Sequence, residues 1–184
     1  PLSRAPTEAD DHPTPSAAQA EARIKDAAQR DAHAREQLRQ EMVRLVVSGD
    51  DAEALAARLD QAYIESMKAG DTNPRAYAEM RDERGTTLLM LAAWHGREAT
   101  AAWLLERQGD IDADDKLERR VYRVNPNARD QKGWTPCAIA AFHGHKGVLK
   151  LLIDAGADFH APNAYKLAPI DLTTDEDVRA MLEE

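Results

Sequence analysis

Apolar residues recur along this chain at the three- and four-residue spacing of one helix face. The first segment with this spacing contains Leu38, Met42, Leu45 and Val46. The second contains Leu55, Leu59, Tyr63 and Met67, and Gly70 is expected to end it. The pattern therefore predicts a pair of helices at the start of a domain that begins near residue 38.

Two later stretches repeat one another at an offset of 48 residues. Residues 85–96 read GTTLLMLAAWHG, and residues 133–144 read GWTPCAIAAFHG. A third, weaker copy at 168–172 follows 33 residues after residues 135–139. Thr87 and Thr135 can cap the helices, which Gly96 and Gly144 should end. Units of this period bury their apolar faces only by stacking, so the repetition predicts a solenoid.

The clearest unit runs from Asp130 to Ala161. It contains, in order, Thr135-Pro136, Ala140-Ala141, Gly144-His145, Leu151-Leu152 and Gly156-Ala157-Asp158. This order resembles the ankyrin repeat family, and the unit from Asp82 to Ala113 matches the family more loosely. The family's histidine is replaced in the three copies by Met90, Ala138 and Asp171.

The resemblance implies an all-α ankyrin-repeat solenoid of stacked helix-turn-helix units with projecting loops. Residues 1–37 are expected to form a disordered tail and a solvated helix, and residues 38–184 the ankyrin-repeat domain. The domain divides into a divergent N-terminal capping repeat (38–81), a repeat (82–114), an inserted finger loop (115–129), a repeat (130–162) and a truncated C-terminal capping repeat (163–184). The finger accounts for the excess of the 48-residue offset over 33, and Val121–Val124 within it has strand character.

The composition of the chain argues against several classes of function. The chain has 184 residues and a net charge of -9, which disfavours binding to nucleic acids and to anionic membranes. It contains no run of eighteen apolar residues, so we expect no membrane span. Cys137 is the only cysteine, which excludes an internal disulfide and leaves the compartment open between cytoplasm and periplasm. The first residue, Pro1, fits either a processed or a trimmed chain.

Motifs for catalysis or cofactor binding are missing from the sequence: it has no phosphate-binding loop, zincin helix or nucleophile elbow. We therefore expect a non-enzyme without cofactor or metal. Cys137 takes the place of a family leucine and should be buried and inert. The acidic run Asp110–Asp115 lacks the glycine and the final carboxylate of a calcium loop. His95 and His143 occupy matching positions about 10 Å apart, the spacing of packed helices, which is too far for one metal ion.

Partner binding is the sharper hypothesis. The family resemblance places contact residues on the loop tips and at the exposed ends of the first helices, and the finger adds a basic cluster. The candidates are Arg84, Trp94, His95, Arg119, Arg120, Tyr122, Arg123, Lys132, Trp134, Phe142, His143 and Tyr165. The four large aromatic residues among them would be the anchors. Alternatively, Trp94 and Phe142 pack into neighbouring repeats and complete the core, where Trp103 is expected.

These observations together predict a monomeric, non-catalytic protein-protein interaction module. It would bind a protein partner through its concave groove and loop tips, as an adaptor, inhibitor or immunity-type protein. The excess of arginine over lysine, 17 to 7, suggests a bacterial gene of high GC content. The alternative is an envelope-associated accessory or stress-protection protein that is tethered by its N-terminal tail.

Overall fold

A computed structural model describes residues 17–68, 80–106 and 124–183 of the chain. The chain divides into two compact units, residues 1–37 and residues 38–184. Helix α1 (Ala17–Ser48) begins in the first unit and ends in the second. Every side chain described between residues 21 and 37 is exposed, in keeping with the polar sequence of this part of the helix.

The second unit opens with the predicted pair of helices, the end of α1 and α2 (Ala52–Lys68). Their facing apolar side chains are buried: Leu38, Met42 and Val46 from α1, and Leu55, Leu59 and Ala62 from α2. The predicted positions Tyr63 and Met67 lie outside the described side chains. An ion pair of 2.7 Å between Arg58 Nε and Glu41 Oε2 also links the two helices.

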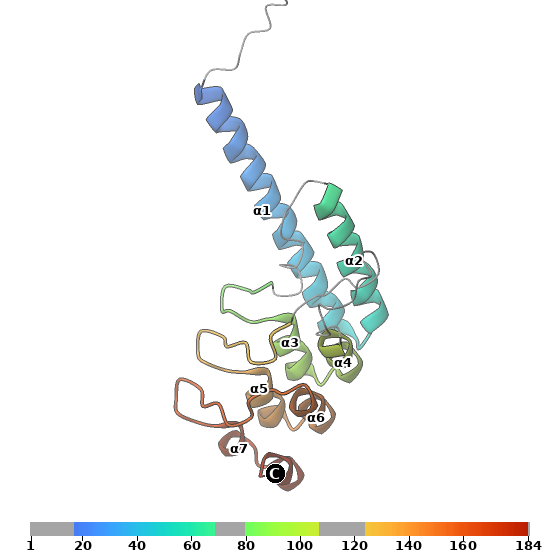
Figure 1. The fold of residues 1–184 in the computed structure, drawn as a ribbon, viewed down its shortest axis with the longest axis vertical. Coiled ribbons are helices and arrows are strands. Elements are labelled where there is room, and N and C mark those ends of the chain that lie inside the picture. Colours follow the sequence, from blue (N-terminus) through green and yellow to red (C-terminus); the bar gives the residue numbers. More distant parts are fainter. Residues whose placement is uncertain (1–16, 69–79, 107–123, 184) are drawn as a thin grey trace, which may run out of the picture. The chain divides into compact units, whose positions relative to one another are not determined.

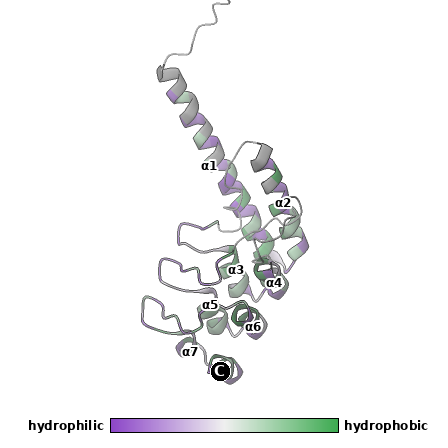
Figure 2. Cartoon of the chain, viewed as in Figure 1, coloured by the Kyte–Doolittle hydropathy of each residue, from purple (hydrophilic) through white to green (hydrophobic). Residues whose placement is uncertain are grey.

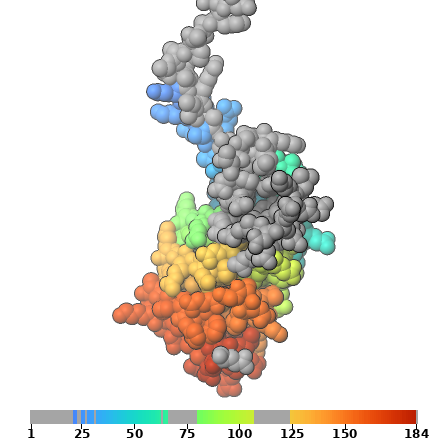
Figure 3. Space-filling view, viewed as in Figure 1, coloured from blue at the N-terminus to red at the C-terminus, as the bar shows by residue number. Residues whose placement is uncertain are grey.

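The described residues from 80 onward contain six further helices in three pairs: α3 (Leu88–His95) and α4 (Glu98–Glu106), α5 (Pro136–His143) and α6 (Lys146–Asp154), and α7 (Pro169–Leu172) and α8 (Glu176–Leu182). The first helices of the pairs pack on one another in the order α3, α5, α7, and the second helices form a row of α2, α4, α6 and α8. The described residues contain no strand. This two-row stack confirms the all-α solenoid, and in Figure 3 the successive units appear as stacked bands of colour.

The helices begin and end where the sequence predicts. Thr87 Oγ1 accepts a hydrogen bond from the N–H of Met90 at 3.3 Å, and Thr135 Oγ1 accepts one from Ala138 at 3.2 Å. These bonds satisfy backbone donors that a helix start leaves unpaired. Gly96 and Gly144 end α3 and α5 with φ of 65° and 72°, a left-handed conformation that side chains disfavour.

Two of the three residues that replace the family histidine still provide a local acceptor. Met90 Sδ accepts a hydrogen bond from the N–H of Thr87 at 3.5 Å. Asp171 Oδ2 accepts one from the N–H of Ala168 at 2.9 Å. Ala138 has no acceptor in its side chain. The turn before α3 and the turn before α7 are therefore each closed by a different chemical group.

The core lies between the two rows of helices. The paired alanines Ala92-Ala93 and Ala140-Ala141 are fully buried, and their small size lets adjacent units approach closely. Figure 2 shows apolar residues concentrated in the stacked helices, whereas the projecting loops are mostly polar. Among the described residues, the buried leucine, valine and methionine side chains from Leu38 to Leu182 belong to one core cluster.

Polar contacts join the first helix pair to the stack. Asp50, between α1 and α2, accepts hydrogen bonds from the N–H groups of Ala99 and Thr100 at the start of α4. The guanidinium of Arg97 donates to the carbonyls of Val46 and Val47 at the end of α1. Both contacts satisfy backbone groups that have no partner within their own helix.

The boundary of the inserted finger differs from the prediction of residues 115–129. Val124 and Ala128 are buried in the core, like Ala157 and Ala161, which lie 33 residues later. Both segments also make the same turn, in which Asn125 and Asp158 each accept a hydrogen bond from the backbone N–H two residues on. Residues 124–129 therefore belong to a repeat, and the additional residues lie before position 124.

Candidate protein-binding surface

Three loop tips project from the same side of the stack (Figure 1) and share one hydrogen-bond pattern. We define the tips as residues 81–86, 129–134 and 162–167. At the second position of each tip, the side-chain Oδ1 accepts hydrogen bonds from the backbone N–H groups two and four residues later. Asp82, Asp130 and Asn163 occupy this position. The N–H of the same residue also donates to the carbonyl four residues on, at 2.9 to 3.1 Å. The three tips consequently have one shape.

Neighbouring tips are bonded to one another. The N–H of Gln131 donates to the carbonyl of Arg84, and the N–H of Ala164 donates to that of Lys132, both at 2.9 Å. Arginines form a parallel ladder: Arg81 donates to the carbonyl of Arg129, and Arg129 to that of Pro162. Because backbone groups make these links, the tips form a continuous and rigid edge.

The third tip departs from the other two in its backbone. Gly85 and Gly133 have φ of 80° and 74°, and the equivalent residue of the third tip is Lys166 with φ of 63°. It is the only non-glycine residue with positive φ among the described residues. A side chain in this conformation costs about 1–2 kcal/mol, so Lys166 is held there by the bonds of its tip.

An aromatic patch lies beside the tips, and we define it as Trp94, Trp134, Phe142 and His143. The Trp94 and His143 rings have centroids 4.4 Å apart, Phe142 and His143 5.1 Å, and Trp134 and Phe142 5.6 Å. Trp94 is 52% exposed and Phe142 54%, while Tyr165 on the third tip is 63% exposed. Trp94 and Phe142 therefore do not complete the buried core, which was the alternative for them.

Trp134 is partly buried and packs against the core, so less of it is available to a partner than its place on a tip implies. Trp103 also packs against the core, as expected. Arg84 and Lys132 are exposed on the first two tips. The predicted contacts Arg119, Arg120, Tyr122 and Arg123 lie outside the described residues.

His143 of the patch lies near His145 and His95, and His145 was not among the site residues predicted from the sequence. His145 stacks on His143 with centroids 5.9 Å apart, and its Nε2 forms a hydrogen bond of 3.1 Å with the carbonyl of Trp94. Gly96 leaves room for this ring, since a Cβ there would lie 2.7 Å from His145 Nδ1. The sequence feature that could have identified His145 is its position directly after Gly144, the glycine that ends α5.

Burial lowers the pKa of both His95 and His143. The positive charge of Arg97, and then that of His145, further lowers the pKa of His95. His145 and His95 act in the same direction on the pKa of His143. The buried Nε2 of His143 has no hydrogen-bond partner among the described residues. Both side chains therefore favour the neutral form near neutral pH.

The family model described as ankyrin repeats (3 copies) matches residues 78–163. These residues are ankyrin repeats. The match covers the first two loop tips, helices α3 to α6 and the first two residues of the third tip. No curated protein matches the chain. Ankyrin repeats generally mediate protein-protein interactions and are typically non-catalytic.

Within the ankyrin stack, Cys137 is fully buried as predicted. Burial, and then the charge of Asp158, raises the pKa of its thiol to about 12. The thiolate, which is the reactive form, is therefore scarce at neutral pH. Among the described residues, no three His, Cys, Asp or Glu side chains form a group that could hold a metal ion. The acidic run Asp110–Asp115 lies outside them. None of the helices in the described parts is long and apolar enough to cross a membrane.

Proposed function

We propose that this chain is a non-catalytic module that binds a protein partner through its loop tips and aromatic patch. It would serve a bacterium as an adaptor, an inhibitor or an immunity-type protein. The observation that carries the proposal is the exposure of Trp94 and Phe142, each by about half, beside a rigid edge of the stack. Tyr165 extends the exposed aromatic surface to the third tip.

Energetics favour this surface over the rest of the domain. Exposed aromatic rings that are already fixed by neighbours lose little conformational entropy on binding and can bury a large apolar area. The rings of the patch contact one another, and the tips beside them are joined by backbone hydrogen bonds. Truncation of the best aromatic anchors in an interface costs about 2 kcal/mol or more.

The test is affinity purification of the full chain from its native cell, followed by mass spectrometry, with three versions of the bait. The wild type should capture a partner that the double variant Trp94→Ala/Phe142→Ala loses. The control Lys150→Ala changes an exposed residue of α6, in the other row of helices, and should keep the partner. Equal capture by all three versions would contradict the proposed surface.

A folding control separates loss of contact from loss of structure. Because each ring is half-exposed, the double variant should retain the helical circular dichroism of the wild type. A collapse of this signal would place the two rings among the residues that hold the stack together.

The second candidate is an accessory or stress-protection protein that its N-terminal segment tethers to the cell envelope. Residues 1–15 contain four prolines and few large apolar groups, a composition typical of tethers. Comparison of the full chain with a chain that begins at residue 38 distinguishes the candidates. Loss of the partner, or of the association with the envelope, on removal of residues 1–37 would favour the tether.

A further inference from the structure

The loop tips differ in charge from the rest of the protein. The segments 81–86, 129–134 and 162–167 together contain five basic and three acidic residues. All other positions of the chain contain 19 basic and 30 acidic residues. A net positive edge on a strongly acidic protein would attract negative groups and repel positive ones.

Contacts within the tips leave the positive side chains in the better position to meet a partner. Asp82 and Asp130 each accept two backbone hydrogen bonds, so their carboxylates are occupied within the tips. Arg84, Lys132 and Lys166 are exposed, and their side chains make no hydrogen bond or ion pair with the described residues. One such cation lies on each of the three tips, and Glu83 on the first tip is the one exposed acidic residue of the three segments.

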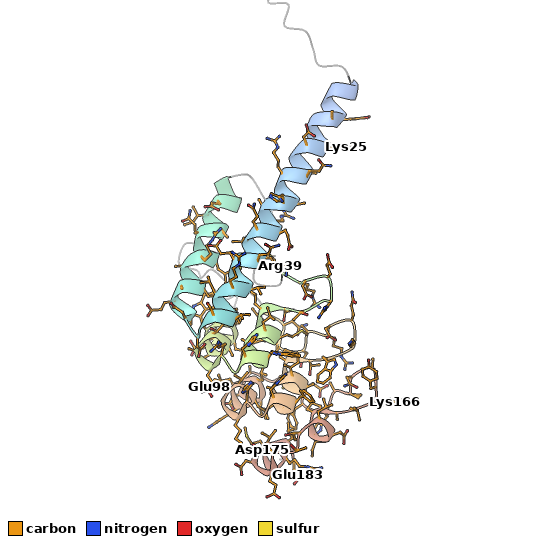
Figure 4. The ribbon with its side chains drawn as sticks, turned by 180° about the vertical axis from the view of Figure 1, so that it is seen from behind. Lys25, Arg39, Glu98, Lys166, Asp175 and Glu183 are labelled. Atoms are coloured by element: carbon orange, nitrogen blue, oxygen red, sulfur yellow. The ribbon has the colours of Figure 1, made fainter. Side chains whose placement is uncertain are left out.

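Lys166 strengthens this assignment. Its backbone adopts a left-handed conformation that the first two tips reserve for glycine. Figure 4 shows its side chain at the end of the third loop, directed away from the helices. A residue in a strained backbone conformation, whose exposed side chain makes no hydrogen bond or ion pair with the described residues, is expected where that side chain has a function outside its own domain.

We propose that the tips and the aromatic patch together bind an extended acidic segment of a partner protein. This inference rests on the proposed protein-binding function. Each tip belongs to one unit of the stack, and packed helices lie about 10 Å apart, so successive tips are expected at about the same spacing. A chain in the polyproline II conformation advances about 3.1 Å per residue and returns to the same face at every third residue, so an acidic residue at every third position could meet successive tips. An apolar or aromatic side chain of the same segment would lie on the rings of Trp94 and Phe142.

A single-stranded nucleic acid also combines negative charge with flat rings. Such a strand has a negative phosphate at every nucleotide. Outside the tips the protein has eleven more acidic than basic residues, which would repel these phosphates. An acidic peptide segment needs to meet only the three tips. Charge therefore favours the peptide, and an oligonucleotide enters the experiment as an alternative ligand.

The experiment is selection of a displayed random twelve-residue peptide library on the full chain. Enriched peptides should have a net negative charge, acidic residues about three positions apart and at least one aromatic or large apolar residue. Their binding, measured by fluorescence anisotropy, should weaken as the salt concentration rises. A labelled single-stranded oligonucleotide should bind at least tenfold more weakly than the best peptide.

Variants connect the binding to individual side chains. Removal of one exposed cation by Arg84→Gln or Lys132→Gln should weaken peptide binding about two- to fivefold, and the matched control Lys150→Gln should leave it unchanged. Lys166→Gly is the most diagnostic variant, because it should weaken binding while raising the midpoint of urea unfolding. A merely structural role for Lys166 would not produce these opposite effects.

The outcomes separate this inference from the proposed function. Peptides that depend on Trp94 and Phe142 but show no acidic excess would overturn the charge inference and leave the protein-binding function standing. Selection of basic peptides, or tighter binding of the oligonucleotide, would also overturn it. A selection that returns no binder would overturn the inference of an extended acidic segment, while the affinity purification would still decide the protein-binding function.

Discussion

Two glycines with nearly equal backbone angles make a matched pair for measuring how strongly neighbouring tips are joined. Gly133 has φ of 74° and Gly156 has φ of 75°. A Cβ added at Gly156 would meet nothing within 4 Å, whereas one at Gly133 would lie 2.8 Å from the backbone nitrogen of Ala164 in the next tip. Substitution by alanine therefore causes the same backbone strain at both positions, and a steric clash only at Gly133.

The magnitudes follow from these distances. The left-handed conformation costs alanine about 1–2 kcal/mol, and the reduced freedom of the unfolded chain offsets about 0.4–1 kcal/mol. Gly156→Ala should thus lower the free energy of unfolding by about 1 kcal/mol. Gly133→Ala must in addition displace Ala164 and weaken its hydrogen bond to Lys132, which adds about 1 kcal/mol. The expected total at Gly133 is about 2 kcal/mol.

Urea unfolding followed by circular dichroism at 222 nm measures both values, provided that the dependence on urea concentration is unchanged between variants. Gly85→Ala should fall between them, since its Cβ would lie 3.3 Å from the backbone of Asp130. Equal destabilisation at Gly133 and Gly156, within about 0.5 kcal/mol, would show that the tips are not coupled and would refute the rigid edge.

Three further predictions concern single side chains. Because burial lowers the pKa of His143 below the 6.5 of the unfolded chain, the unfolded state binds more protons as the pH falls, so the free energy of unfolding should decrease from pH 7 to pH 5. In His143→Gln this decrease should be smaller, and an unchanged slope in urea titrations would contradict the assignment. Asp50→Ala should destabilise the domain by about 1–2 kcal/mol, because α4 loses its acceptor; an unchanged urea midpoint would argue against the cap. Cys137 should react with a thiol reagent at pH 8 only when urea unfolds the chain, and rapid labelling of the native protein would refute its burial.

The sequence was most informative where a local rule determines the structure. Thr87 and Thr135 begin helices because their hydroxyl groups satisfy nearby backbone donors, and Gly96 and Gly144 end them because side chains disfavour the left-handed conformation. Each rule depends on residues within about five positions. Helix starts, helix ends and the order of repeats could therefore be predicted before any coordinates were known.

Contacts between units were harder to predict, since they depend on residues about 33 or 50 positions apart. The role of Asp50 as an acceptor for α4 follows from the stacking of two helix pairs, and so does the ring of His145 over Gly96. The end of the finger was misplaced because Val124 and Ala128 were read as an insertion rather than aligned with Ala157 and Ala161. The exposure of Trp94 was also hard to predict, because it depends on how much of the Trp94 ring the neighbouring unit covers.

The arginine ladder gives the stack a polarity. Each guanidinium reaches toward the unit that follows in the chain, from Arg81 to Arg129 and from Arg129 to Pro162, and proline has no group with which to continue. Duplicated copies of residues 129–161, spliced in tandem, would each bring their own donor and could propagate the array. A copy that begins at Pro162 would end the array, because proline has no side-chain donor for a following unit. The residue at this position therefore distinguishes an internal repeat from a final one in an engineered array.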